Sequence, residues 1–191
     1  MTRAVILAGG RGTRLRPYTI SLPKPLMPIG DKPILEIIIG QLAAQGIEHI
    51  TLAVNYQAEI LRAYFADGNK WKVRIDYSLE SQPLSTMGPL KLISDLPDNF
   101  LVLNGDVLTD LNYAKFVRAH TDAGALFTIS AAARTQKIDL AFSKSTRISA
   151  FADSTKSRLF PIWLAWASIV CTDECSIGYR PGGHSDSIIW C

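Results

Sequence analysis

The sequence predicts an α/β fold built on a mostly parallel sheet. Short apolar runs alternate with amphipathic segments through residues 1–139, the intervals between them suit βα units, and the first run ends in a glycine-rich turn. Strands that alternate with helices pair in parallel and are joined by right-handed crossovers. The chain has 191 residues, 48% of them hydrophobic, which suffices for one folded domain with a substantial core.

The first two elements are a buried strand and an amphipathic helix. Residues 4–7 are continuously apolar and precede two glycines, which is typical of a buried parallel strand and its turn. Apolar residues then recur at helical spacing between residues 33 and 45. Asp31 is the expected N-cap of this helix, and Gly46 is the expected stop.

The same alternation continues along the chain. It predicts strands at 49–54, 72–77, 100–103 and 125–130, and helices at 57–66 and 113–121. Asn55 and Asp110 are the expected caps of the two helices. In a doubly wound sheet with the strand order third, second, first, fourth, the first and fourth strands are neighbours, and a crevice opens where their chains leave the sheet.

Charge and hydropathy exclude several classes of partner. The net charge is +3 and no run of like charges occurs, so we expect neither nucleic acid nor a membrane as a partner. No apolar stretch is long enough for a signal-peptide core or a membrane-spanning helix, which predicts a cytoplasmic protein. All three cysteines lie in the last 21 residues, so no disulfide framework is predicted for the rest of the chain.

The turn after the first strand is rich in glycine and arginine. Its bare backbone exposes N–H groups, and Arg11, Arg14 and Arg16 stand beside them, which suits a polyphosphate. Neither the dinucleotide fingerprint nor the Walker A pattern is satisfied. The alternative is a tight turn without a ligand.

A second basic feature follows ten residues later. Pro23, Pro25 and Pro28 hold the backbone in an extended path and aim the side chain of Lys24. The alternative is a stiff surface connector with a solvated lysine.

Together these segments resemble a known family. Residues 7–17 (LAGGRGTRLRP) and 22–28 (LPKPLMP) look like the signature of the sugar-phosphate nucleotidyltransferases, or NDP-sugar pyrophosphorylases, and residues 30–36 and 104–106 continue it in order. Within this family, the sequence most resembles the branch of the mannose-1-phosphate guanylyltransferases. The resemblance covers residues 1–139 and implies a Rossmann-like three-layer nucleotidyltransferase fold, truncated at the C-terminal side.

The resemblance implies a reaction and a set of site residues. A nucleotidyl group passes from a nucleoside triphosphate, GTP by branch, to a sugar-1-phosphate, mannose-1-phosphate by branch, and pyrophosphate leaves. The implied catalytic residues are Arg14 and Lys24, the implied Mg²⁺ ligand is Asp106, and the implied nucleotide-binding residues are Leu7, Ala8, Gly9, Gly10, Gly12, Thr13 and Gly88.

Several alternatives stay open. Glucose-1-phosphate with dTTP or UTP is a second substrate pair, and a non-catalytic nucleotide-binding subunit, associated with itself or with an intact homologue, is a second class of function. Asp106 alone could be an ordinary turn residue. In residues 84–90, which resemble the family's base-recognition loop, Ser85 replaces a glycine and is expected to crowd the base.

After Asp139 the pattern dissolves, so we divide the chain into a nucleotidyltransferase domain at 1–139 and a poorly ordered tail at 140–191. Read two nucleotides out of phase, the codons available to the tail permit three stretches that resemble the family's continuation, in order, so we predict that the tail is frameshifted. The family's sugar-phosphate lysine and second metal-binding aspartate are absent in frame, which predicts weak nucleotide binding and little turnover. The alternative is a zinc site made by Cys171, Cys175, His184 and Cys191.

Overall fold

The computed structural model describes residues 2–82, 84–136 and 160–172. The chain divides into two compact units, one made by residues 1–130 with 167–191 and the other by residues 131–166. The described residues of the second unit are parts of two strands, β7 (Phe127–Gln136) and β8 (Phe160–Thr172), which are neighbours in one sheet. Every residue of the site described below belongs to the first unit.

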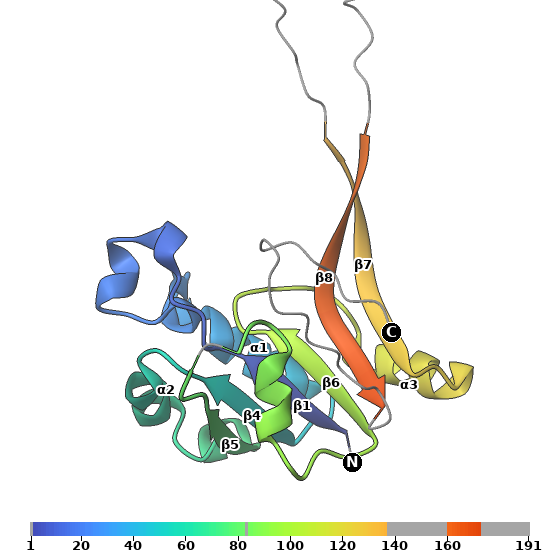
Figure 1. The fold of residues 1–191 in the computed structure, drawn as a ribbon, viewed down its shortest axis with the longest axis horizontal. Coiled ribbons are helices and arrows are strands. Elements are labelled where there is room, and N and C mark those ends of the chain that lie inside the picture. The colour runs from blue at the N-terminus through green and yellow to red at the C-terminus, as the bar shows by residue number, and fades with distance from the viewer. Residues whose placement is uncertain (1, 83, 137–159, 173–191) are drawn as a thin grey trace, which may run out of the picture. The chain divides into compact units, whose positions relative to one another are not determined.

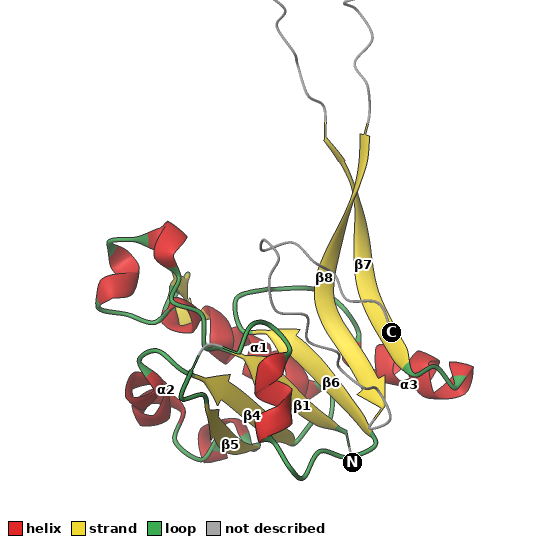
Figure 2. Cartoon of the chain, in the orientation of Figure 1, coloured by secondary structure: helices red, strands yellow, loops and turns green. Residues whose placement is uncertain are grey.

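Four parallel strands form the centre of the first unit (Figures 1 and 2). They are β1 (Arg3–Leu7), β4 (His49–Val54), β5 (Arg74–Leu79) and β6 (Asn99–Asn104), and the sheet order is β5-β4-β1-β6-β8-β7. Strands β1, β4, β5 and β6 pair in parallel, whereas β8 pairs with β6 in the antiparallel direction. The predicted order of the first four strands and the mostly parallel sheet are therefore confirmed.

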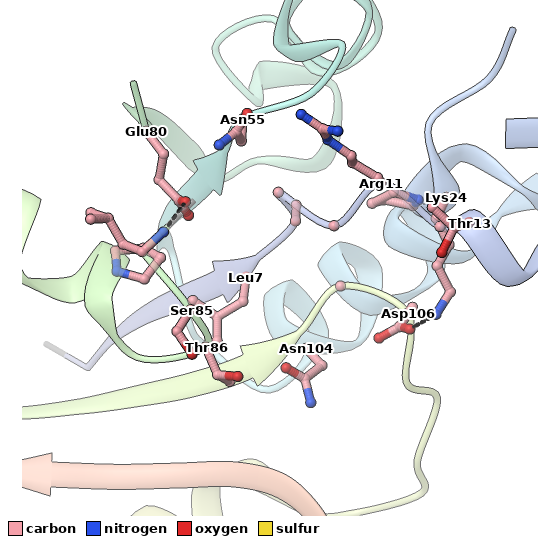
Figure 3. Close-up of a pocket in the computed structure, with 18 of the residues that line it drawn as sticks. Leu7, Arg11, Thr13, Lys24, Asn55, Glu80, Ser85, Thr86, Asn104 and Asp106 are labelled. Carbon is pink, nitrogen blue, oxygen red and sulfur yellow. Dashed lines mark hydrogen bonds and ion pairs between the residues drawn. The ribbon is translucent and has the colours of Figure 1, made fainter. Parts of the chain in front are cut away.

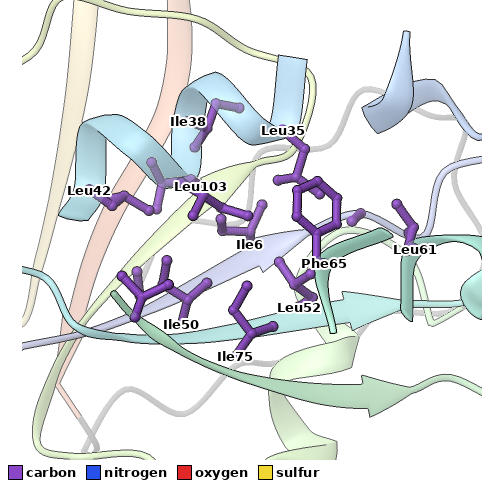
Figure 4. Close-up of a cluster of buried hydrophobic side chains, with 14 of the residues drawn as sticks. Ile6, Leu35, Ile38, Leu42, Ile50, Leu52, Leu61, Phe65, Ile75 and Leu103 are labelled. Carbon is purple, nitrogen blue, oxygen red and sulfur yellow. The ribbon is translucent and has the colours of Figure 1, made fainter. Parts of the chain in front are cut away.

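One face of the sheet is covered by three helices, α1 (Ile34–Ala44), α2 (Ala58–Phe65) and α3 (Tyr113–Ala123). Figure 4 shows the core that they enclose, in which Ile6, Ile50 and Leu103 from the strands meet Leu35 and Phe65 from the helices. These side chains are fully or almost fully buried. Because side chains alternate along a strand, the intervening residues face the other side of the sheet.

The other face carries a smaller core. Val5 and Phe100 pack there against Leu90 and Ile93, which lie in or beside the 3-10 helix η5 (Gly88–Leu92). The connection from β5 to β6 thus runs over the face opposite to α1 and α2. This reversal makes the carboxyl ends of β1 and β6 the switch point of the sheet, where ligands of open α/β folds bind.

A long excursion separates β1 from α1. It contains the 3-10 helices η1 (Thr13–Leu15), η2 (Tyr18–Ile20) and η3 (Lys24–Leu26) and an antiparallel pair of two-residue strands, β2 (Pro28–Ile29) and β3 (Lys32–Pro33). The sequence predicts an extended path here. Pro23 is extended, but Lys24 begins a 3-10 turn, because Pro25 suits the first turn of a helix and lacks an N–H that needs a partner.

Helix capping differs from the prediction at three positions. Pro33, not Asp31, precedes α1, and the side chain of Asn112, not that of Asp110, caps α3 by accepting a 2.8 Å hydrogen bond from Lys115 N. Helix α3 begins at Tyr113, so Asp110 lies too early in the chain to reach its free N–H groups. Gln57 precedes α2, which leaves Asn55 outside the cap. The predicted stop at Gly46 is confirmed, with a φ of 80°.

Beyond residue 130 the structure adds strand where the sequence predicts none. The fifth predicted strand extends to Gln136, and Phe160–Thr172 form β8. The rest of the predicted tail, 140–159 and 173–191, lies outside the described residues, as do three of the four residues of the alternative zinc site. None of the described helices is long and apolar enough to cross a membrane.

Candidate functional site

A pocket of about 560 Å³ opens at the carboxyl edge of the parallel sheet. Its volume is in the range of small-molecule sites. Its walls come from the turn after β1, from η3, from the chain after β4, β5 and β6, and from the loop before η5. The lining residues are Leu7, Ala8, Gly9, Gly10, Arg11, Gly12, Thr13, Arg14, Leu15, Lys24, Pro25, Asn55, Glu80, Leu84, Ser85, Thr86, Pro89, Asn104, Gly105 and Asp106.

The register of β1 and β6 brings the two central loops of the pocket together. Leu7 pairs with Asn104 at the last position of both strands. The N–H of Gly105 then donates to the carbonyl oxygen of Leu7 at 2.9 Å. A Cβ on Gly105 would lie 3.1 Å from that oxygen, so glycine allows the close approach. Asp106 consequently enters the pocket beside the glycine turn.

The glycine turn presents unused backbone donors. Within the described part of the chain, the N–H groups of residues 9–12 donate no hydrogen bond. Gly12 has a φ of 58°, and its carbonyl oxygen accepts a 2.9 Å hydrogen bond from the hydroxyl of Thr19. A Cβ on Gly12 would lie 2.9 Å from Thr19 Cγ2 and 3.1 Å from Lys24 Cβ. Gly12 therefore lets the segment that carries Lys24 close against the turn.

Charged groups gather at one end of the pocket. The ammonium group of Lys24 donates to and forms an ion pair with Asp106 Oδ2, and both side chains are about one third exposed (Figure 3). Arg11 and Arg14 also line the pocket, are exposed, and form no ion pair within the described part of the chain. Exposed guanidinium groups beside free backbone N–H groups suit the oxygens of a phosphate chain.

The structure brings almost all the residues that the sequence singled out into this pocket. Arg14, Lys24 and Asp106 line it, together with the predicted nucleotide-binding residues Leu7, Ala8, Gly9, Gly10, Gly12 and Thr13. Gly88 does not line it. Gly88 begins η5, and a Cβ there would lie 2.6 Å from Leu84 Cβ, so its place in the structure is to let the 84–88 loop fold back on itself.

Sequence reasoning missed one pocket residue and misread another. Glu80 follows β5 and accepts a hydrogen bond from Leu84 N at 3.3 Å through Oε2. Only the rule that strand ends of a parallel sheet share one edge could have indicated it. Asn55, expected to be a helix cap, lines the pocket instead. Ser85 also lines it and has a φ of 66°, a left-handed backbone conformation that favours glycine.

Comparison with known proteins gives consistent results. The sequence model of the family described as nucleotidyl transferase matches residues 3–142. Mannose-1-phosphate guanyltransferase from Neurospora crassa is 45% identical over 132 residues, which cover 65% of this chain and 36% of that protein. UTP--glucose-1-phosphate uridylyltransferase from Synechocystis sp. is 39% identical over 140 residues, which cover 66% of this chain and 36% of that protein.

A solved structure supports the same relationship. The crystal structure of HddC from Yersinia pseudotuberculosis complexed with GMP-PN is 27% identical, with a TM-score of 0.65, over 90% of this chain and 77% of that chain. The chain spans about a third of the length of the curated relatives it matches, since 36% of each of the two proteins above is covered. Residues 3–142, the part matched by the family model, are more than half of the chain and contain the whole pocket lining. The chain therefore belongs to the nucleotidyl transferase family.

Proposed function

We propose that the pocket binds a nucleoside triphosphate and that the site serves the transfer of its nucleotidyl group to a sugar-1-phosphate, with release of pyrophosphate. One observation carries the proposal. Unused backbone donors of the glycine turn, the cations of Arg14 and Lys24, and the carboxylate of Asp106 line a single pocket at the switch point of the sheet. A polyphosphate that reacts at phosphorus needs this combination of anion-binding groups.

The proposed substrates are GTP and mannose-1-phosphate. The relative from Neurospora crassa supports this pair by its name, and HddC was crystallised with GMP-PN. The relative from Synechocystis sp. favours UTP with glucose-1-phosphate as the second candidate. Both pairs use the same chemistry and differ at the base and the sugar.

In the proposed reaction a phosphate oxygen of the sugar-1-phosphate attacks the α-phosphorus of the triphosphate. The bond between that phosphorus and the oxygen bridging to the β-phosphate breaks, and pyrophosphate leaves with the bonding electron pair. A phosphate nucleophile is already ionised near neutral pH, so no general base is required. Arg14 is proposed to hold the departing pyrophosphate, and Lys24 to neutralise charge that builds up on the α-phosphate.

Asp106 is the proposed contact for Mg²⁺. Mg²⁺ often binds through one or two carboxylates plus substrate phosphates, and the partly exposed carboxylate of Asp106 next to a phosphate-sized cradle fits that pattern. Residues 2–82 and 84–131, whose side chains are described, contain no group of three His, Cys, Asp or Glu that could hold an ion without a substrate. When bound, Mg²⁺ supplies charge neutralisation to the phosphates.

A nucleotide-binding protein without turnover is the second candidate. The strained Ser85 at the loop that resembles a base-recognition loop favours weak binding. Asp106 is the only carboxylate beside the proposed phosphate cradle among the described residues, which favours weak catalysis. We therefore propose that turnover by this chain is low compared with that of full-length relatives.

Calorimetric titration with GTP, with and without Mg²⁺, tests binding, and coupled release of pyrophosphate from GTP and mannose-1-phosphate tests turnover. Arg14→Gln is expected to weaken GTP binding by about tenfold, because a charge-assisted hydrogen bond to phosphate is lost. Arg118→Gln is the matched control, since Arg118 is exposed on α3 and outside the pocket. Absence of nucleotide binding by the unaltered chain contradicts the proposal, and binding without pyrophosphate release selects the second candidate.

A further inference from the structure

The loop that carries Asp106 is held at its start by the sheet. Gly105, directly before Asp106, donates its N–H to the carbonyl oxygen of Leu7 at 2.9 Å. The N–H of Val107 donates to the carbonyl oxygen of Asn104 at 3.4 Å, which closes a turn around Asp106. These bonds fix where the loop leaves β6. The course of the loop toward α3 depends on what binds its other end.

Two glutamines of α1 hold that other end. Nε2 of Gln41 donates to the carbonyl oxygen of Thr109 at 3.2 Å. Nε2 of Gln45 donates to the carbonyl oxygen of Leu111 at 3.4 Å. Oε1 of Gln45 also accepts a 2.6 Å hydrogen bond from the N–H of Tyr113, the first residue of α3. Gln45 therefore uses both the donor and the acceptor of its amide on the backbone of the loop. We call Gln41 and Gln45 the amide clamp.

The amide clamp restricts the position of Asp106. Its two glutamines are four residues apart, so they share one face of α1 and meet the same loop. Between Gly105 and Thr109, both of which are held, only residues 106–108 intervene. Leu108 packs against the core that α1 covers. A stretch this short, bonded at both ends, has little conformational freedom, so the clamp limits where the carboxylate can lie.

Helix α1 also holds the ion-pair partner of Asp106. Its first residue, Ile34, donates its N–H to the carbonyl oxygen of Met27 at 3.0 Å. Met27 directly follows η3, which carries Lys24, and Leu26 of η3 is buried in the core beside α1. One helix is thus bonded to both segments whose side chains form the Lys24–Asp106 ion pair (Figure 3). The spacing of these two segments is therefore set through α1.

Stability alone is a poor explanation for Gln41. Its Oε1 is buried and has no hydrogen-bond partner within the described part of the chain. An unpaired buried acceptor destabilises the folded state, which offsets the contribution of the bond to Thr109. A methionine of similar length would fill the same space without that cost. The contact of Gln41 therefore contributes to the position of the loop more than to stability.

We propose that Gln41 and Gln45 are positioning residues, which hold the carboxylate of Asp106 where it can bind Mg²⁺ on the phosphates of a nucleotide. The proposal rests on the proposed function, because it takes Asp106 as the Mg²⁺ contact. Neither glutamine is among the pocket-lining residues, so both act through the loop and not on a ligand. Removal of groups that orient a metal ligand commonly weakens metal binding about 10- to 100-fold.

The experiment compares GTP affinity in EDTA and in saturating Mg²⁺, by titration calorimetry, for the full chain and for the double variant Gln41→Met/Gln45→Met. The ratio of the two affinities is the gain from Mg²⁺. The double variant is expected to lower this gain about tenfold, or to remove it where the gain is smaller, and to leave GTP affinity in EDTA undiminished. An equal loss of GTP affinity in both conditions shows a general structural role and overturns the proposal.

The matched control is Gln57→Met. Nε2 of Gln57 donates to the carbonyl oxygen of Ile20 at 2.9 Å, and its Oε1 is buried without a hydrogen-bond partner among the described residues. The same kind of contact is therefore lost, but away from the loop of Asp106. The gain from Mg²⁺ is expected to stay unchanged in Gln57→Met. A fall in the gain as large as that in the double variant overturns the proposal.

A double-mutant cycle tests whether the amide clamp acts through Asp106. In an Asp106→Asn background, the two clamp substitutions are expected to leave GTP affinity in Mg²⁺ unchanged, because the carboxylate that they position is gone. A further fall in affinity shows that the clamp acts elsewhere and overturns the proposal. If the double variant does not fold, Gln41→Met gives the same comparisons, since little change in its stability is expected.

Hydrogen exchange gives a readout without metal or nucleotide. The N–H of Tyr113 stands at the start of α3, where a helix offers it no backbone partner, so its protection depends on Gln45. Slow exchange of this amide in the unaltered chain is expected, and exchange as fast as in an open loop overturns the proposal. An undiminished Mg²⁺ gain in the double variant contradicts the amide clamp alone. Absence of GTP binding, or of any Mg²⁺ gain, in the unaltered chain contradicts the proposed function as well.

Discussion

Lys24 and Asp106, 82 residues apart in the sequence, form an ion pair that joins η3 to the turn after β6. The pair keeps two groups of opposite charge together inside a pocket whose proposed ligands are an anionic phosphate chain and a cation. Binding of both ligands must therefore replace the Lys24–Asp106 ion pair by two others, one between Lys24 and phosphate and one between Asp106 and Mg²⁺. We therefore expect the effect of Asp106 on nucleotide affinity to depend on whether Mg²⁺ is present.

Asp106→Asn is expected to strengthen GTP binding several-fold in EDTA, because the variant removes a negative charge and frees the ammonium group of Lys24. The same change is expected to abolish any gain in GTP affinity on adding Mg²⁺, since the carboxylate proposed to bind Mg²⁺ is lost. Titration calorimetry in EDTA and in Mg²⁺ measures both. Asp110→Asn, at an exposed position outside the pocket, is the control, and an undiminished Mg²⁺ effect in Asp106→Asn contradicts the assignment.

Ser85→Gly is expected to raise the free energy of unfolding by about 0.5 kcal/mol, because relief of a left-handed φ of 66° outweighs the larger entropy of glycine in the unfolded chain. Urea denaturation measures the change. Ser81→Gly, at an exposed serine four residues earlier without a positive φ, is expected to lower the stability instead. If Ser85 also crowds the base, nucleotide affinity rises in Ser85→Gly but not in Ser81→Gly. A loss of stability equal in both variants would contradict strain at Ser85.

Glu36 is a buried carboxylate that links α1 to α2 and to η4 (Asn69–Trp71). It accepts hydrogen bonds from Tyr64 Oη at 2.6 Å, from Lys70 Nζ at 3.2 Å and from Trp71 Nε1 at 3.2 Å. The bond from Tyr64, above all, lowers the pKa of Glu36 below its usual value of 4.5, although burial opposes it. Because the folded-state pKa is lowered, this contribution to stability is present above pH 4.5 and is lost as the pH falls through the folded-state pKa.

Glu36→Gln is therefore expected to lower stability at pH 7 by about 1 to 3 kcal/mol and to flatten the loss of stability on acidification below pH 4.5. Urea denaturation at a series of pH values gives both quantities. Glu59→Gln is the control, because the side chain of Glu59 on α2 is 83% exposed. An unchanged acid dependence in Glu36→Gln shows that other carboxylates carry it.

His120 is buried near the end of α3. Its Nδ1 lies 2.8 Å from Thr128 Oγ1, and its Nε2 lies 3.2 Å from Asn99 Oδ1. Burial lowers its pKa below 6.5, so the unfolded chain takes up a proton first as the pH falls. We expect stability to decline below pH 6.5, and we expect NMR titration of the ring to give a pKa below that of the same residue in urea. A ring pKa at or above the urea value contradicts this.

The DNA around codon 139 offers a test of the predicted domain boundary. The family match ends at residue 142, close to that boundary, and the frameshift of the tail stays a prediction. Sequencing of independent templates is expected to find the alternative frame open beyond codon 139 and similar to the family's continuation. A stop codon in that frame within the stretch that encodes residues 140–191 contradicts the frameshift.

The sequence predicts the sheet and the position of the pocket because both depend on patterns that are local to each segment. Continuous apolar runs identify β1 and β6, and the strand order then places the loops after them side by side. Capping is predicted less well: α3 begins at Tyr113, as predicted, but its cap is Asn112, directly before it, and not Asp110. Glu80 escapes sequence reasoning because its contacts come from Leu84 and from the register of β5 with β4.

The pairing of Leu7 with Asn104 also determines when the pocket can exist during folding. The two residues are 97 positions apart in the sequence, so the loop that closes between them is long and its closure is slow relative to local helix formation. The nucleotide binding that we propose for this pocket would therefore report on the completion of the β1–β6 ladder. In a refolding experiment, the fluorescence change of a bound fluorescent nucleotide is expected to lag behind the recovery of the helical circular dichroism signal. The lag measures how late β1 and β6, which are far apart in the sequence, pair with each other.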